Sequence, residues 1–371
     1  MSSLATMLQA PGALVECDDD PEAVFEMLCA KGWSDGLPVI PPTPERVERM
    51  LGYCDRDFDQ PVVEIPPRFG AATPIRVAAN AVMAGCKPEY FPLVLLALEA
   101  LAEELYNLYG TQATTHPCTP MLIFNGPVAK EVGINSGHNA MGNYFRANAV
   151  IGRAVRLSLV NIGAAIPGTG DMATTGTPAK FLFCVAENED HTPWEPLHVE
   201  HGFPKDASAV TVVAAESPHN VNDHESITPE GILTMIAGTM AITGSNNAYY
   251  AGQPVLTFGP EHAATVASRG MSKADVRQWL WDHATIPLSK FSQEGIERRF
   301  RRKLSGQFAN APLDTPVHMW GKPEDLIVIV TGGAGKHSQY VPTFGNTRSV
   351  TRVLKRADGE LVKSIQELKR G

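Results

Sequence analysis

Residues 326–336 read LIVIVTGGAGK, and this stretch decides the expected fold more than any other. Its apolar, largely β-branched run predicts a buried strand, and the glycines after it predict a turn at the strand's end. Shorter apolar runs that predict further strands occur at 120–124, 180–186, 209–215 and 255–258. Helical patterns alternate with these runs. The sequence therefore predicts an α/β fold with mixed or mostly parallel sheets flanked by helices.

Several of the expected helices begin with a capping residue, in most cases followed by proline. The starts are Asp20-Pro21, Thr43-Pro44, Thr73-Pro74, Thr228-Pro229 and Ser272. Two polar loops rich in His, Pro, Asn and Asp bracket the strand expected at 209–215. We therefore expect two α/β lobes, one over 1–205 with an extended N-terminal arm and one over 206–371 that contains the glycine-rich turn.

The composition narrows the classes of partner. Charged residues make up 19% of the 371 residues, against about 25% in an average soluble domain, so we expect part of the surface to be covered in a homo-oligomer. The net charge of −9 argues against nucleic-acid binding. Residues 287–371 hold 15 Lys and Arg against 8 Asp and Glu. This basic part either docks on the acidic part, faces a partner or an anionic substrate, or forms ordinary solvated helix faces.

The cysteines and the apolar runs indicate the cellular compartment of the protein. The six cysteines are scattered without a CxxC pair, and no basic segment followed by an apolar run marks a secretion signal. The longest apolar stretch, at 91–98, is far shorter than the ~20 residues of a membrane span. We expect a reduced, cytoplasmic protein that does not enter a membrane.

Histidines and carboxylates gather between residues 187 and 225, where five of the eleven histidines lie. Such side chains bind transition metals or transfer protons near neutral pH. We expect His198, His219 and His224 to act as acid/base groups or as ligands of a divalent metal, with Glu187 or Glu195 as the carboxylate partner. The spacing matches no zinc signature, so a pair of hydrogen-bonded polar loops remains the alternative.

The turn after the strand at 326–331 is a second candidate. Gly333 and Gly335 allow a ligand to approach the backbone, and Lys336 and Ser338 can bind an anion. His337 is a further candidate for proton transfer. The spacing is not that of a P-loop, and a purely structural turn is the alternative.

The loop at 166–176 is a third candidate, because its glycines, hydroxyls and Asp171 suit a ligand-lining loop. Arg153 lies on the preceding helical stretch, and we expect it to hold the anionic end of a substrate together with Lys336. The loops are expected to converge on one site between the two lobes. These features favour an enzyme, a lyase or a hydrolase, that performs acid/base chemistry on a small anionic metabolite, with or without the assistance of a metal.

Thiol catalysis is another alternative, because His116 lies two residues before Cys118 and can activate its thiol. No G-x-S-x-G motif is present, which excludes the nucleophile elbow of the α/β-hydrolases.

Several short sequence segments resemble segments of bacterial proteins associated with the UGSC (seleno)protein family. The segments are GWSDGLP at 32–38, ANAVMAGC at 79–86, ANAVIGRA at 147–154, PWEPLH at 193–198, GPEH at 259–262 and MSKADV at 271–276. The resemblance implies a multi-component enzyme of small-molecule metabolism. The Cys-Gly-Ser-Cys motif that names the family is absent from this chain. The thiol chemistry would then belong to a separate redox partner protein, and this chain would be a non-catalytic subunit of a thiol or selenol complex.

Overall fold

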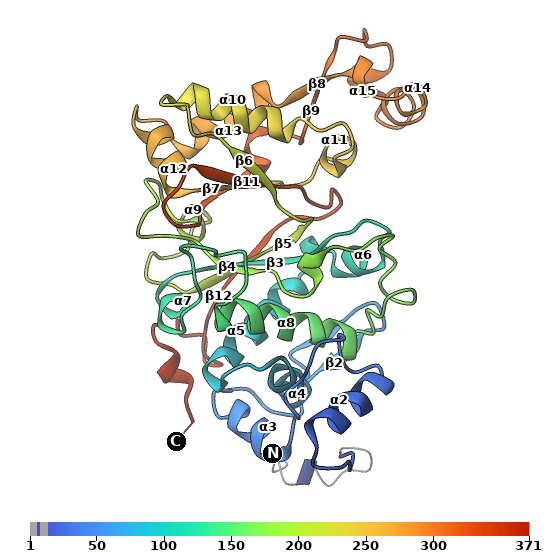
Figure 1. The fold of residues 1–371 in the computed structure, drawn as a ribbon, viewed down its shortest axis with the longest axis vertical. Helices are drawn as coiled ribbons and strands as arrows, with labels where there is room; N and C mark the ends of the chain where they lie inside the picture. Colours follow the sequence, from blue (N-terminus) through green and yellow to red (C-terminus); the bar gives the residue numbers. More distant parts are fainter. Residues whose placement is uncertain (1–5, 8–13, 371) are drawn as a thin grey trace. The chain divides into compact units, whose positions relative to one another are not determined.

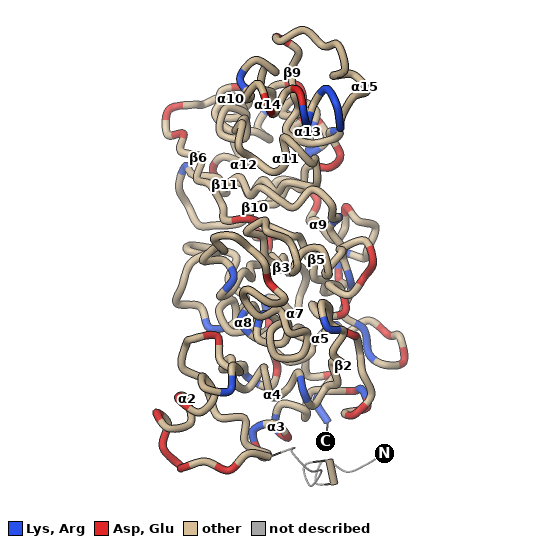
Figure 2. The backbone as a smooth tube through the Cα atoms, turned by 90° about the vertical axis from the view of Figure 1, so that its right-hand side faces the viewer, with Lys and Arg blue, Asp and Glu red and all other residues tan. Residues whose placement is uncertain are grey.

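The computed structural model describes residues 6–7 and 14–370. Most of the predicted N-terminal arm, residues 1–5 and 8–13, lies outside the described residues. The acidic run Asp18–Asp20 comes directly before the first of the helices described below, α2 (Pro21–Ala30) (Figure 2). Asp20 caps this helix as predicted, because its Oδ1 accepts a hydrogen bond from the Ala23 amide at 2.8 Å.

The chain forms two compact units. Among the described residues, the first unit contains those up to Glu187, Pro196–Ala214 and those from Ser349 onward, and the second contains Asn188–Glu195 and Ala215–Arg348. A single division near residue 205 was expected from the sequence. The chain differs from this because residues 349–371 return to the sheet of the first unit.

A four-stranded sheet forms the centre of the first unit, in the order β12-β5-β3-β4 (Figure 1). Its strands are β3 (Thr119–Asn125), β4 (Cys184–Ala186), β5 (Ala209–Ala215) and β12 (Val350–Val353). β3 and β4 run parallel, whereas β12 and β5 run antiparallel. Every residue of β3, β4 and β5 is buried, which is why these strands are largely apolar in the sequence.

Helices cover this sheet. α5 (Phe91–Leu101) packs on β12, and α8 (Arg146–Asn161) packs on β4 and on α4 (Pro74–Ala84) (Figure 1). The other elements of the unit are α3 (Pro44–Leu51), α6 (Leu108–Ala113), α7 (Pro127–Glu131), α9 (Leu197–Glu200) and the hairpin of β1 (Val63–Ile65) and β2 (Gly70–Ala72).

The second unit has its own four-stranded sheet, in the order β10-β7-β11-β6. The strands are β6 (His219–Asn222), β7 (Val255–Phe258), β10 (Ile327–Val330) and β11 (His337–Val341). β10 and β7 are parallel, and β11 is antiparallel to both β7 and β6. The predicted α/β fold with mixed sheets is therefore confirmed.

In the second unit, α10 (Pro229–Met240) packs on β6 and β11 and contacts α12 (Pro260–Ala267) and α13 (Lys273–His283) (Figure 1). Ser272 and Asp275 form a capping box at the start of α13. The remaining α-helices and strands described in this unit are α11 (Asn246–Tyr250), α14 (Gln293–Gly295), α15 (Ser305–Phe308), β8 (Thr285–Pro287) and β9 (Pro316–His318).

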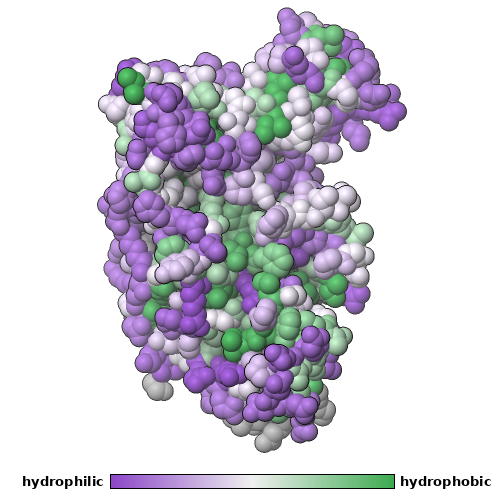
Figure 3. Space-filling view, in the orientation of Figure 1, coloured by the Kyte–Doolittle hydropathy of each residue, from purple (hydrophilic) through white to green (hydrophobic). Residues whose placement is uncertain are grey.

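No helix within residues 14–370 is both long and apolar enough to cross a membrane. Hydrophobic residues gather on the visible face of the first unit, over α4 and α8 (Figure 3). Exposed large apolar side chains of this unit include Trp33, Leu37 and Ile40. Exposed apolar patches often mark interaction surfaces, and the homo-oligomer expected from the composition stays a prediction.

Candidate functional site

Two imidazole rings meet in the second unit, at the end of the β6–β11 pair. His224 follows β6, and His337 is the first residue of β11. Their Nε2 atoms lie 3.3 Å apart, and the rings meet edge to face with centroids 5.2 Å apart. Both side chains are exposed. A hydrogen bond between two imidazole nitrogens needs one donor and one acceptor, so at least one of the two rings is neutral in this arrangement.

Asn220 orients this pair. Its Oδ1 lies 3.0 Å from Nδ1 of His337. Because an amide oxygen only accepts, His337 carries a proton on Nδ1. When both rings are neutral, Nε2 of His337 therefore accepts the hydrogen bond from Nε2–H of His224. Nδ1 of His224 is then left with a lone pair. We call His224 and His337 the imidazole pair, and Asn220 is the residue that orients it.

Lys336 places a positive charge beside the pair. Its Nζ donates a hydrogen bond to the backbone oxygen of His224 at 2.9 Å, which leaves further N–H donors of the ammonium for an anion. The turn that carries Lys336 needs its glycines, because Gly332 and Gly335 have φ of 115° and 138°. Asn188 supports the turn by donating a hydrogen bond to the Gly332 oxygen at 3.1 Å.

Ser338 does not face a ligand. It is buried, and its Oγ lies 2.8 Å from Nδ1 of His262 and accepts a hydrogen bond from the Gly259 amide. Nε2 of His262 lies 2.9 Å from the backbone oxygen of Asp223 and must donate to it, so Ser338 donates to Nδ1. This network ties α12 to β11 and to the residue before His224. Ser338 is therefore a positioning residue and not the predicted substrate-binding group.

Burial lowers the pKa of His262, although the hydrogen bond to the Asp223 oxygen acts in the opposite direction. The unfolded chain, with a histidine pKa of about 6.5, then binds more protons than the folded chain in mildly acidic solution. We expect the contribution of His262 to the free energy of unfolding to be fully present above the pKa of the unfolded chain. It is lost as the pH falls through the lower pKa of the folded protein.

Urea denaturation of the wild type and of His262→Gln between pH 8 and pH 5 tests this expectation. The variant is less stable at pH 8 and loses less stability on acidification than the wild type. Equal slopes of unfolding free energy against pH in the two proteins would contradict the assigned neutral state of His262.

His219 lies apart from the imidazole pair. It begins β6, opposite Tyr340, whereas His337 is opposite Asn222 at the other end of the strand. Side chains alternate along a strand, so His219 lies on the other face from Asn220. The structure brings together His224 and His337 from the predicted set, and it does not add His219 to them.

Other predicted residues belong to the first unit, where they have structural partners. Glu187 is buried, and its Oε2 accepts hydrogen bonds from the Asn125 amide at 2.7 Å and from the Leu197 backbone at 2.8 Å. His198 is completely buried, with Nε2 3.3 Å from the Lys205 oxygen. These contacts anchor the segment around α9 and give neither group the accessibility that catalysis needs.

Arg153 does not hold a free anion site. Its guanidinium forms two hydrogen bonds of 2.7 Å with the Asp35 carboxylate and a third with the Leu37 oxygen. The Arg153 and Asp35 side chains are 12% and 11% exposed. This bidentate pair fixes the extended segment around residue 35 on α8.

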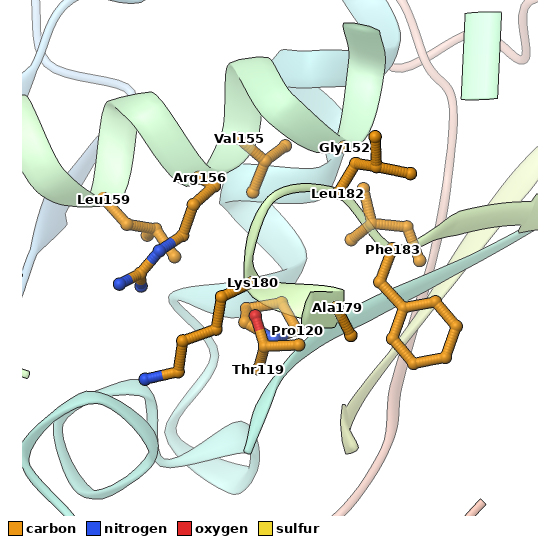
Figure 4. A pocket seen from close by; sticks show the side chains of 11 residues that line it. Thr119, Pro120, Gly152, Val155, Arg156, Leu159, Ala179, Lys180, Leu182 and Phe183 are labelled. Atoms are coloured by element: carbon orange, nitrogen blue, oxygen red, sulfur yellow. The ribbon is translucent and has the colours of Figure 1, made fainter. Parts of the chain in front are cut away.

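Asp171 is the anionic centre of a largely buried cluster. Its carboxylate accepts hydrogen bonds from Arg156 of α8 at 2.6 Å and from Lys180 at 2.5 Å. Figure 4 shows that the Arg156 and Lys180 side chains extend to the same side. They line a cavity of about 10 Å³, the size of one water molecule. Asp171 is therefore the counter-ion of Arg156 and Lys180, and the cavity that these two cations line has no room for a metabolite.

Burial raises the pKa of Asp171, but the Lys180 hydrogen bond and the Arg156 charge outweigh this effect, so the pKa lies below its usual value. The strand expected at 180–186 is shorter than predicted. Residues Pro178–Lys180 instead form a 3-10 helix that carries Lys180 to Asp171.

Cys118 is buried, and its Sγ lies 3.6 Å from the Thr111 oxygen. A thiol packed in this way is not accessible to a substrate, which argues against the thiol alternative.

Across residues 14–370, no group of three or more His, Cys, Asp or Glu side chains is placed to hold a metal ion. His198 belongs to the first unit, and the two other predicted ligands, His219 and His224, belong to the second. The donor set expected for a divalent metal is not present in the described residues, and we derive no step through a metal.

Sequence reasoning missed Asn220 and His262. The one sequence signal for Asn220 is the single apolar residue, Val221, among the polar residues of 219–222. No signal in the sequence pairs His262 with a serine 76 residues away.

Neither a protein-family model nor a curated protein matches this chain. The resemblance to the UGSC-associated proteins stays a prediction.

Proposed function

We propose that the second unit is an enzyme that transfers protons to and from a small anionic metabolite, with His224 as the general base. The observation that carries the proposal is the 3.3 Å contact between Nε2 of His224 and Nε2 of His337. A base whose second nitrogen is held by an oriented partner is a common arrangement in catalysis. Asn220 is the group that orients the partner.

The positions of the protons on the two imidazole rings support this role. His224 has its lone pair on Nδ1 and is exposed, so a substrate proton can be transferred to it. The imidazolium that forms keeps its Nε2–H on His337, and this hydrogen bond becomes charge-assisted and stronger. Returning the proton to the product restores the neutral pair. The atoms and charges of this cycle balance within the pair and the substrate.

Lys336 favours an anionic substrate. Its ammonium is tied to the backbone of His224, so the bound anion lies close to the base. A fixed cation next to the reacting centre also stabilises negative charge that develops when a proton is removed.

Hydrogen exchange in D2O tests the proposal by screening many compounds at once. The wild-type protein is incubated with a panel of small carboxylates, phosphate esters and their neutral amide or alcohol analogues, and the loss of C–H signals is followed by NMR. We expect exchange in at least one anion and in none of the neutral analogues. His283→Gln, which changes an exposed histidine stacked on Trp279, is expected to exchange as the wild type does. Exchange of no anion, or equal exchange of neutral analogues, would contradict the proposal.

A further inference from the structure

The first unit contains a cavity of about 250 Å³ that the proposed acid/base function does not use. It lies between residues 53–56, the α5 residues from Pro92 to Glu99, and the C-terminal residues 352–359 with Leu368. We call it the C-terminal pocket. Its volume is near the lower end of that of small-molecule sites, which limits the ligand to a compact molecule.

The C-terminal segment is firmly attached around this pocket. The Arg370 amide donates to the Gly52 oxygen at 2.8 Å, and the Arg370 guanidinium stacks on Phe58 and donates to the Arg56 oxygen at 3.0 Å. The Ala357 amide donates to the Asp55 carboxylate. The walls are therefore held in place by contacts on both sides.

Positive charge dominates the lining. It contains four cations and two carboxylates, which are Arg56, Arg352, Lys355 and Arg356, and Asp55 and Glu99. The lining thus carries an excess of two positive charges. Burial raises the pKa of the Cys54 thiol to about 11, so this neighbouring group stays neutral and does not reduce the excess.

Two of the arginines form only long ion pairs with the two carboxylates of the lining. Arg56 lies 3.4 Å from Asp55 and 3.4 Å from Glu99, and Arg352 lies 3.5 Å from Glu99. These distances are longer than the 2.7–2.9 Å of strong charge-assisted hydrogen bonds. Arg352 also pairs through Nη1 with Glu103, which lies outside the lining. Part of each guanidinium therefore remains available to a ligand.

The other two cations have fewer acidic neighbours. Among the acidic side chains of the described residues, Arg356 contacts only Asp358, at 3.2 Å. The Lys355 ammonium makes no ion pair with any residue in the described part of the chain. Guanidinium and ammonium donors therefore remain for a bound oxyanion.

The pocket also has an apolar wall. Pro92, Leu95 and Leu96 of α5 and Leu354 and Leu368 of the C-terminal segment are buried side chains that line the pocket. An inorganic ion alone leaves this wall in contact with water. A ligand that combines an anionic group with an apolar body uses both walls.

We propose that the C-terminal pocket is a second binding site, which takes a phosphate monoester with a small apolar body. The dianionic head pairs with the cations of the lining, and the guanidinium forks of Arg56, Arg352 and Arg356 suit phosphate oxygens. The apolar body packs against the leucines of α5. The site lies entirely within the first unit, so this proposal stands or falls independently of the acid/base function of the second.

Isothermal titration calorimetry on the full chain tests the proposal with phenyl phosphate as the probe. We expect phenyl phosphate to bind at least tenfold more tightly than inorganic phosphate, benzoate or phenol. Inorganic phosphate measures the binding of the phosphate group alone, and phenol measures that of the aromatic ring alone. Benzoate keeps the ring but carries one negative charge in place of two. No binding of phenyl phosphate, or equal affinity for any of the three comparison compounds, would overturn the proposal.

Variants locate the binding to the pocket. Lys355→Gln/Arg356→Gln changes two exposed side chains and is expected to weaken phenyl phosphate binding about tenfold or more without a change in melting temperature. Lys369→Gln removes one exposed charge from the same segment outside the lining, and it is the matched control with unchanged affinity. Unchanged affinity in the double variant would place the phosphate elsewhere and overturn the assignment.

Discussion

Asp171→Asn is expected to lower the free energy of unfolding by about 3–5 kcal/mol, the cost of removing one partner from a buried ion pair. The change removes the negative charge between Arg156 and Lys180, whose side chains are only 12% and 17% exposed. Two cations are then left side by side with little water to solvate them. Urea denaturation followed by circular dichroism measures the effect.

Asp206→Asn is the matched control for this loss. It is the same substitution in the same unit, and it breaks the exposed pair with Lys363. Exposed pairs contribute little, so we expect its denaturation midpoint to match that of the wild type. If Asp171→Asn also unfolds at the wild-type midpoint, the Asp171 cluster does not stabilise the first unit.

The Asp171 effect also depends on pH in a defined direction. The pKa of Asp171 is lowered in the folded protein, so its contribution is fully present above the unfolded carboxyl pKa of about 3.9. It is lost as the pH falls through the lower folded value. The difference between wild type and Asp171→Asn therefore shrinks in strongly acidic solution.

His224→Gln is expected to slow proton exchange of the best anion about 10²–10⁴-fold, the usual contribution of a general base. The variant keeps a polar side chain of similar length but has no basic nitrogen. Because His224 is exposed, the melting temperature is expected to stay close to that of the wild type. The exchange rate in D2O and the thermal midpoint are measured on the same preparations.

His337→Gln separates positioning from catalysis. His337 acts through His224, so we expect a smaller loss of rate than in His224→Gln, together with a change in the pH profile of exchange. Full exchange activity in His224→Gln would exclude this residue as the base, whatever the result for His337.

The strands that could be predicted from the sequence are the fully buried ones. β3, β5, β7 and β10 are continuous apolar runs, and a short apolar run between turn signals predicts a buried strand. β6 and β11 escaped prediction because polar residues alternate with buried ones in them. β6 also lies at the sheet edge, where it pairs only with β11. Its histidine and asparagines therefore read as a loop.

The candidate site could be predicted only in part, because its contacts join residues far apart in the sequence. His224 and His337 were both candidates, but their contact across 113 residues depends on the β6–β11 register. Arg153 and Asp171 were predicted to bind a ligand because a lone charge in a sequence shows no counter-ion. Their partners are Asp35, 118 residues away, and Lys180 with Arg156. Residue type predicts the chemistry available, whereas tertiary contacts decide which charges are already satisfied.

Nitrogen NMR of the histidine side chains tests the central claim most directly, because it reports where each ring carries its proton. We predict, near neutral pH, a proton on Nδ1 of His337 and on Nε2 of His224, with a hydrogen bond between the two Nε2 atoms. Asn220→Leu is expected to abolish the preference of His337 for Nδ1. A proton on Nε2 of His337 in the wild type, or two fully protonated rings, would contradict the account.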